Sequence, residues 1–219
     1  YSPNQKLILK ELSQDLDVSP MPVREAMNHL EKDGLVKKIP HQGYTVSPLS
    51  LGEMEELFAL RIVLEAFAVK SAGAPIEEQS LKKLFDLTGE MEKYIKEHEK
   101  KTNPPPPESE QKKFMSINRE FDLTIVSAGG YTHLPTILHS IFDKSERYMN
   151  LLEFVVGMDR GDLLDHQNIV QAIQNQESAK AERFIKEHIQ RVLEELKQYV
   201  INHDWIPEDE HRLKNSHTS

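Results

Sequence analysis

The sequence lacks cysteine and long apolar runs, and each absence excludes a class of protein. Without cysteine there are no disulfides and no thiolate metal ligands, which fits a cytoplasmic location. The apolar runs are only a few residues long, too short for a transmembrane helix. The first four residues do not have the basic and then apolar pattern of a secretory signal. We therefore expect a cytoplasmic chain whose 219 residues suit a small domain joined to a larger one.

Negative charge dominates the chain but is unevenly distributed. Residues 1–50 hold six Lys or Arg and six Asp or Glu, so the rest of the chain carries the whole formal charge of −9. Such a chain cannot coat nucleic acid with its entire surface. Its neutral first segment can still bind DNA, because the local placement of cations decides the contact.

Residues 1–50 show the pattern of a winged helix-turn-helix. Residues 7–16 form an expected short helix with leucines and an isoleucine on one side. A second helix follows Ser19 as N-cap, with Pro20 at its first position, and Gly34 ends it. Residues 35–39 and 44–46 read as two short strands around a turn. We expect a DNA-binding domain over 1–50.

From residue 51 onward the pattern is helical. Six helices are expected, near 51–73, 77–100, 110–128, 134–153, 160–175 and 177–203. Glycines or prolines mark most of the breaks, and the proline run at 104–107 predicts an extended connector. The predicted fold is mainly α: the winged helix-turn-helix, an all-helical bundle over 51–204 and a polar tail over 205–219.

The second helix of the first domain is the candidate recognition helix, which reads base edges with its first turns. Ser19, Met21 and Arg24 lie there, and Arg24 suits a guanine or a phosphate. The alternative is that Arg24 merely pairs with Glu25 or Asp17 on a solvated face. The hairpin supplies further candidate DNA contacts, namely Lys37, Lys38, His41, Gln42 and Gly43.

Two stretches carry a family resemblance. "ELSQDLDVSPMPVREAMNHLEKDGLVKKIPHQGYTV", residues 11–46, resembles the DNA-binding module of the GntR family of bacterial transcriptional regulators. "LRIVLEAFAVKSA", residues 60–72, resembles the start of the FCD ligand-binding domain of the FadR-type branch, VanR-like with about six helices. The resemblance implies a homodimer that binds a palindromic operator, as repressor or activator, under the control of a small metabolite.

Two features depart from this family pattern. Family members usually carry an arginine directly after the serine of "VS", where this chain has Pro20, so one DNA contact is absent. The family module also usually has another helix ahead of Glu11. We therefore expect that this domain lacks its first helix.

Four polar side chains stand out in the helical region. Asn118 and Asp122 are four residues apart on one helix face, and His166 and His188 lie among apolar residues on two other helices. A carboxylate and two imidazoles that converge in a bundle could bind a divalent metal ion, and the alternative is ordinary core or surface histidines.

The family resemblance implies the same four residues as candidate metal ligands. Many FCD domains bind zinc, nickel or manganese through an Asp and a His four residues apart and two later His. Here Asn118 falls on the Asp position and Asp122 on the first His position, which predicts a weaker or different metal preference.

Arg61 is the principal candidate for effector binding. It lies four residues before Glu65 in an apolar helix, which by itself indicates an ion pair within the helix. In the family this position faces the cavity, so the resemblance implies that Arg61 clamps a carboxylate effector. Arg147 and Tyr148 are further candidates of this kind.

Three functions compete. The first is a regulator whose binding to double-stranded operator DNA is controlled by a small organic acid. The second is a metal-dependent helical-bundle enzyme, and the third a helical interaction module with a degenerate DNA-binding head. The enzyme lacks support, because no Ser-His pair, cysteine or pair of Glu-rich helices supplies a nucleophile or base. We predict the regulator, without catalytic residues.

Overall fold

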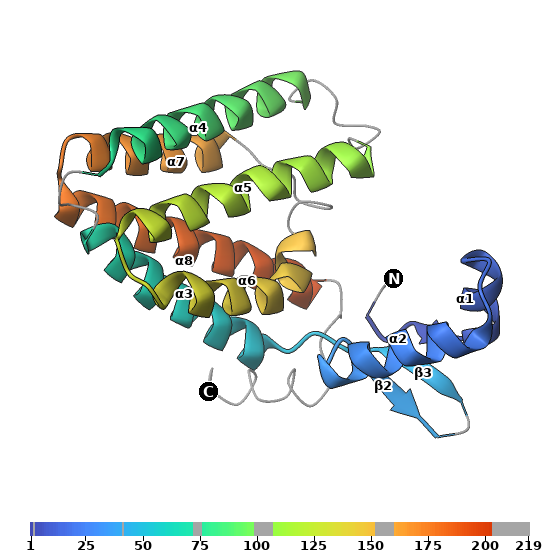
Figure 1. Cartoon of the computed structure of the whole chain (residues 1–219). Helices are drawn as coiled ribbons and strands as arrows, with labels where there is room; N and C mark the ends of the chain where they lie inside the picture. Colours follow the sequence, from blue (N-terminus) through green and yellow to red (C-terminus); the bar gives the residue numbers. More distant parts are fainter. Residues whose placement is uncertain (2, 41, 72–75, 99–106, 152–159, 203–219) are drawn as a thin grey trace. The chain divides into compact units, whose positions relative to one another are not determined.

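The computed structural model describes residues 1, 3–40, 42–71, 76–98, 107–151 and 160–202. It divides the described chain into two compact units, of which the first contains Tyr1–Leu51 and the second Gly52–Tyr199. Figure 1 shows a small mixed unit and an all-helical one, which confirms the predicted fold class.

The first unit is a winged helix-turn-helix. Its elements are β1 (Lys6–Leu7), α1 (Leu9–Asp15), α2 (Pro20–Lys32), β2 (Val36–Ile39) and β3 (Gly43–Val46). The strands form an antiparallel sheet in the order β1-β3-β2, with Val36 opposite Val46 and Lys6 opposite Thr45. Strand β1 was not predicted, and it takes Leu7 out of the expected first helix.

One small apolar core holds this unit together. Its buried members come from β1, α2, β2 and β3, and are Leu7, Val23, Met27, Val36 and Tyr44. The Tyr44 hydroxyl donates a hydrogen bond of 2.8 Å to Asn28 Oδ1, which ties β3 to α2. Gly34 follows α2 with a φ of +75°, the left-handed conformation that ends many helices.

The described residues of the second unit form six helices, as predicted. They are α3 (Leu51–Ser71), α4 (Glu78–His98), α5 (Glu108–Ala128), α6 (Leu134–Leu151), α7 (Arg160–Gln174) and α8 (Ser178–Asn202). The ends predicted at residues 73, 100, 153 and 203 lie outside the described residues, as does most of the proline run. Pro107 is the N-cap of α5.

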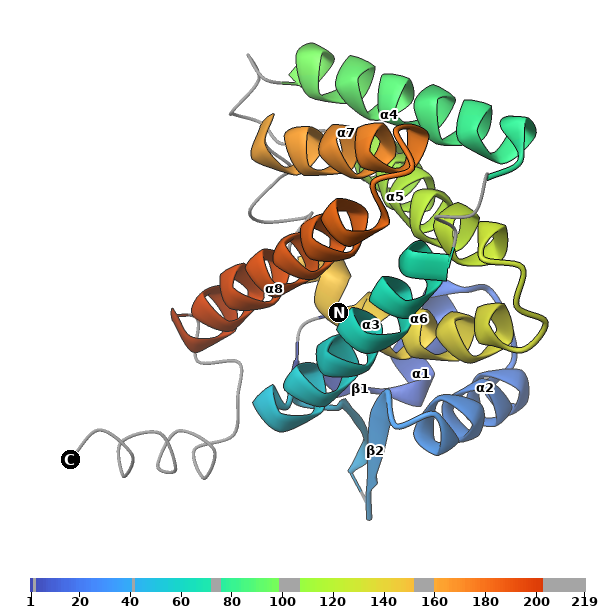
Figure 2. The ribbon, with the colours of Figure 1, turned by 90° about the vertical axis from the view of Figure 1, so that its left-hand side faces the viewer.

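Helix α5 has a central place in this unit, because it packs against both α4 and α6, while α4 also packs against α7. Figure 2 shows α3 crossing in front of α6. Large apolar side chains of α3, α5, α6 and α8 are fully buried, among them Phe58, Phe121, Leu138 and Ile189. Within the described ranges no helix is long and apolar enough to cross a membrane.

Candidate functional site

The start of α2 presents the predicted recognition residues to solvent. Ser19 is the N-cap in extended conformation but makes no capping hydrogen bond with its side chain, and Pro20 occupies the first turn. Met21 is 72% exposed, and Arg24 on the next turn is exposed. In the described part of the chain Arg24 has no ion-pair partner, so the alternative pairing with Glu25 or Asp17 is not formed.

The hairpin places a second set of polar groups at the surface. Lys37 and Lys38 are exposed on β2, and Gln42 is exposed in the turn. Gly43 has a φ of +99°, and a Cβ there would lie 3.0 Å from the Leu7 carbonyl oxygen, so this position requires glycine. His41 lies outside the described residues.

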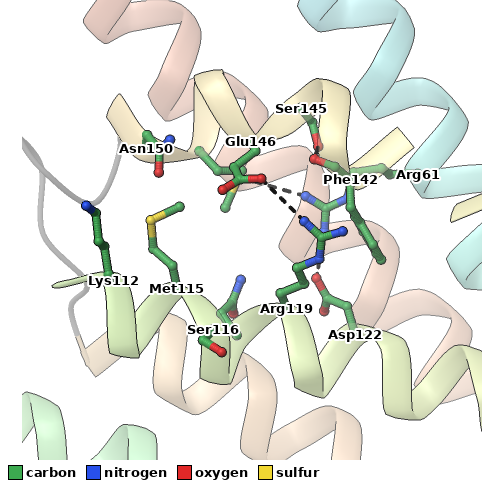
Figure 3. Close-up of a pocket in the computed structure, with 12 residues that line it drawn as sticks. Arg61, Lys112, Met115, Ser116, Arg119, Asp122, Phe142, Ser145, Glu146 and Asn150 are labelled. Atoms are coloured by element: carbon green, nitrogen blue, oxygen red, sulfur yellow. Dashed lines mark hydrogen bonds and ion pairs between the residues drawn. The ribbon is translucent and has the colours of Figure 1, made fainter. Parts of the chain in front are cut away.

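The second unit contains a cavity of about 590 Å³ among α3, α5 and α6. Figure 3 shows cationic, acidic and apolar side chains around it. Its lining comprises Arg61, Lys112, Met115, Ser116, Asn118, Arg119, Asp122, Phe142, Ser145, Glu146, Met149 and Asn150. Its apolar members are Met115, Phe142 and Met149, and the other lining residues are polar or charged, so the cavity suits a small polar organic ligand.

Arg61 is held in this cavity by two carboxylates. Its Nε donates to Glu65 Oε1 and its Nη2 to Asp122 Oδ2, both at 2.8 Å. All three residues are buried. Burial by itself lowers the pKa of Arg61, but the charges of Glu65 and Asp122 outweigh it, so the pKa is raised and the guanidinium stays charged. Arg61 thus lies in the cavity lining, where its role as an effector contact remains a prediction.

Asp122 has an unusual protonation state. Burial raises its pKa, and the negative charge of Glu65 raises it further, while Arg61 opposes both effects. The resulting pKa is about 8. Near neutral pH, Asp122 therefore carries a proton much of the time, and the two carboxylates around Arg61 together hold less than two negative charges.

The cavity has two further cations that the sequence analysis missed, Lys112 and Arg119 on α5. Arg119 pairs with Asp143 and, at 3.4 Å, with Glu146 of α6, and Figure 3 shows the Glu146 carboxylate directed toward it. Both cations could have been found from the sequence, because Lys112 and Arg119 lie at the helical spacing that places them on the same face as Asp122.

Arg147 and Tyr148, the other two candidate effector residues, are not among the residues that line this cavity. Both bind Glu53 at the start of α3, with a hydrogen bond of 2.6 Å from the Tyr148 hydroxyl and an ion pair from Arg147. Burial and this hydrogen bond raise the pKa of Tyr148 to about 12. The contacts of Arg147 and Tyr148 with Glu53 connect α6 to α3. Arg147 and Glu53 are 94 residues apart, so local sequence patterns cannot reveal their contact.

His166 and His188 do lie together, with ring centroids 4.6 Å apart. His166 Nδ1 donates to the Asp162 carbonyl oxygen at 2.7 Å, which leaves Nε2 as a buried acceptor without a donor among the described residues. Burial, followed by the charge of His188, lowers the pKa of His166 to about 3, so this ring is neutral. His188 Nδ1 faces Asp165 at 3.3 Å.

The predicted three-ligand metal centre is not assembled. Across the described ranges, no three His, Cys, Asp or Glu side chains converge on a point that could hold a metal ion. The physical reason is that the Asp122 carboxylate is already paired with Arg61. The positive charge of Arg61 also repels a metal ion from this carboxylate. His166 Nε2 and Asn118 Oδ1 are buried and without hydrogen-bond partners among those residues, but they do not complete a site.

Comparison with known proteins accounts for both units. Residues 1–46 match the family of bacterial regulatory proteins named gntR, and residues 56–191 match the FCD domain family. The HTH-type transcriptional regulator YdhC of Bacillus subtilis is 28% identical over 207 residues, which cover 90% of this chain and 87% of the relative. The HTH-type transcriptional regulator McbR of Escherichia coli is 30% identical over 123 residues, which cover 56% and 51% of the two chains.

Solved structures share the fold. The structure of E. coli McbR/YncC has a TM-score of 0.68 at 23% identity, with 90% of this chain and 89% of that chain covered. The metal-free FCD domain of TM0439 has a TM-score of 0.52 at 16% identity, with 70% and 98% covered. Because the FCD model covers more than half of the chain and follows a GntR head, this chain belongs to the GntR family of FCD-domain transcriptional regulators, which are not enzymes.

Proposed function

We propose that the regulator binds operator DNA as a homodimer, in the cytoplasm, through the start of α2 and the wing. The exposed arginine at the start of α2 carries this proposal. Arg24 lies on the first turns of a helix that would enter the major groove, and Lys37 and Lys38 would reach the backbone from β2.

An alanine substitution of Arg24 tests the DNA contact. Arg24→Ala should weaken binding to an operator by at least tenfold without lowering the melting temperature, because the side chain is exposed. Lys32→Ala removes an equal charge from the last turn of the same helix and serves as the control. Equal loss in both variants would indicate a general electrostatic effect and would contradict a recognition role for Arg24.

We propose further that a small organic acid binds in the cavity of α3, α5 and α6 and changes the affinity for DNA. The cations Arg61, Lys112 and Arg119 favour an anionic ligand, which would compete with Glu146 for Arg119. Asp122 opposes the ligand only weakly because of its raised pKa. The mechanism is a shift between two arrangements of the dimer, which requires the acid to bind one arrangement more tightly.

Two adjacent lysines provide a matched test of the effector site. Lys112 lines the cavity and Lys113, also exposed, does not. Calorimetric titration with citrate and a panel of smaller carboxylates should show binding that Lys112→Ala and Arg119→Ala reduce about tenfold each. Lys113→Ala should bind as the unmodified protein does. Equal affinities in all four proteins would contradict the assignment of the cavity.

The prediction that the chain binds zinc, nickel or manganese now depends on His166 and His188 alone. The proposed function does not require a metal. Elemental analysis of the protein beside a His166→Ala/His188→Ala variant tests it. About one ion per chain, lost in the variant, would support a metal site, whereas no ion in either protein would contradict it.

A further inference from the structure

Arg119 of α5 and Glu146 of α6 form an ion pair in the lining of the cavity. Their closest atoms, Arg119 Nη1 and Glu146 Oε2, are 3.4 Å apart, and Figure 3 shows the two groups facing each other. A strong contact between a guanidinium and a carboxylate measures about 2.7–2.9 Å. The two side chains also remain 31% and 53% exposed. The pair is therefore a loose one, which a ligand can enter.

Arg119 is held in position from its other side. Its Nη2 donates to Asp143, and His139 Nδ1 lies 3.3 Å from the same nitrogen. Neither of these partners is among the described residues that line the cavity. Arg119 Nη1 can therefore change its partner within the cavity while Nη2 keeps the guanidinium in place.

A plain carboxylic acid does not replace this ion pair well. Its carboxylate would accept a hydrogen bond from Arg119 Nη1, but the Glu146 carboxylate would then lie beside a second negative charge. A ligand that carries a carboxylate and a cation side by side avoids this repulsion, because it replaces both members of the pair. Its carboxylate binds Arg119, and its cation donates to Glu146.

The short separation of the pair decides where the cation of the ligand must be. Arg119 Nη1 and Glu146 Oε2 are close enough to contact each other, so the two groups of the ligand that replace them must also be neighbours. An ammonium group on the carbon next to the carboxylate meets this requirement, whereas an amine at the far end of a chain does not. The arrangement that fits is that of an α-amino acid.

Lys112 favours a second carboxylate on the same ligand. It also lines the cavity and lies seven residues before Arg119 on α5, which corresponds to about 10 Å along the helix axis. Its long side chain can reach a negative group at the far end of a small ligand. An amino acid with an acidic side chain therefore suits the cavity better than a neutral one.

We propose that the acid bound in the cavity is an acidic α-amino acid, whose α-carboxylate binds Arg119 and whose ammonium group binds Glu146. The proposal rests on the acid site proposed above and specifies its ligand. Glu146 is then the residue that distinguishes an amino acid from other acids of the same size.

Three acids with the same carbon skeleton test the proposal. Succinate, malate and aspartate differ only in whether one carbon carries a hydrogen, a hydroxyl or an ammonium group. In calorimetric titration, aspartate should bind the unmodified protein about tenfold more tightly than succinate, with malate between them, because a charged donor strengthens a hydrogen bond to a carboxylate. Glutamate beside glutarate repeats the comparison with a longer chain. EDTA in the buffer keeps metal ions out of the measurement.

Neutralising Glu146 should change the affinities in opposite directions. Glu146→Gln should bind aspartate more weakly and succinate more tightly than the unmodified protein does, so that the preference for aspartate falls to about twofold or less. Asp143→Asn removes an equal charge from the other side of Arg119, outside the cavity lining, and should keep the preference. Circular dichroism should show intact folds, because both carboxylates are exposed.

The possible outcomes separate this proposal from the acid site itself. An ion pair that only joins α5 to α6 would not produce opposite changes for aspartate and succinate. Amino acids that bind no better than succinate and glutarate, or a preference that survives in Glu146→Gln, would overturn the proposal and leave the acid site standing. If neither these acids nor citrate bind, the acid site is contradicted together with this proposal.

Discussion

At the scale of single residues, the cavity is defined by one guanidinium shared between two buried carboxylates. Two charged carboxylates around Arg61 would leave an uncompensated negative charge in a buried site, which is costly. The raised pKa of Asp122 relieves this, because a protonated Asp122 still contacts Arg61 but carries no charge. Asp122 therefore links the protonation of the cavity to the stability of the helical unit.

The stability contributed by protonated Asp122 should depend on pH in a definite direction. Its pKa is raised from 3.8 to about 8 in the folded state, so the contribution is complete below about pH 4 and is lost as pH rises through about 8. Asp122→Asn keeps an oxygen for Arg61 but cannot titrate. The melting temperature of Asp122→Asn relative to that of the unmodified protein should therefore increase by several degrees from pH 5 to pH 8.5. A constant difference would contradict the raised pKa.

His166 should show the opposite dependence. Its pKa is lowered from 6.5 to about 3, so its contribution is present above pH 6.5 and is lost as pH falls toward 3, when the unfolded chain takes up the proton first. His166→Phe, which fills a similar volume beside Phe121, should lose less stability than the unmodified protein between pH 6.5 and pH 4. Thermal unfolding at intermediate pH values measures this, and parallel curves would contradict it.

At the scale of elements, most of the fold was predictable and the cause of each miss is physical. The six long helices were correctly placed because their apolar periodicity is local. Strand β1 was missed because two residues have no periodicity, and only pairing with β3 defines them. Of the candidate effector residues, Arg61 lies in the cavity, whereas Arg147 and Tyr148 contact Glu53, a partner too distant in sequence for local patterns to reveal.

Two glycines of the first unit should differ in their tolerance of a side chain. Both have positive φ, but a Cβ at Gly34 would meet nothing within 4 Å, whereas one at Gly43 would lie 3.0 Å from a backbone oxygen. Gly34→Ala should therefore cost about 1–2 kcal/mol of unfolding free energy, from backbone strain alone. Gly43→Ala should cost more, because the strand pairing of β1 with β3 must also shift. Urea unfolding of both variants measures the difference, and equal losses would contradict the close contact.

At the scale of the whole molecule, the proposed regulator combines a DNA-binding unit with a cavity for an anion. A homodimer places two recognition helices at a fixed spacing, so its operator should be palindromic, with half-sites separated by a whole number of helical turns. Because binding uses several cations, its affinity should fall steeply as salt concentration rises. An acid in the cavity can change this affinity only through differential binding to the two arrangements of the dimer.

We propose above that this chain reads a specific DNA sequence through the start of α2. The most direct test is selection of bound sequences from a pool of random duplex DNA, with the unmodified protein, Arg24→Ala and Lys32→Ala in parallel. We expect the unmodified protein and Lys32→Ala to enrich the same palindromic sequence and Arg24→Ala not to enrich it. Failure of the unmodified protein to enrich any sequence, or the same enrichment with Arg24→Ala, would contradict it.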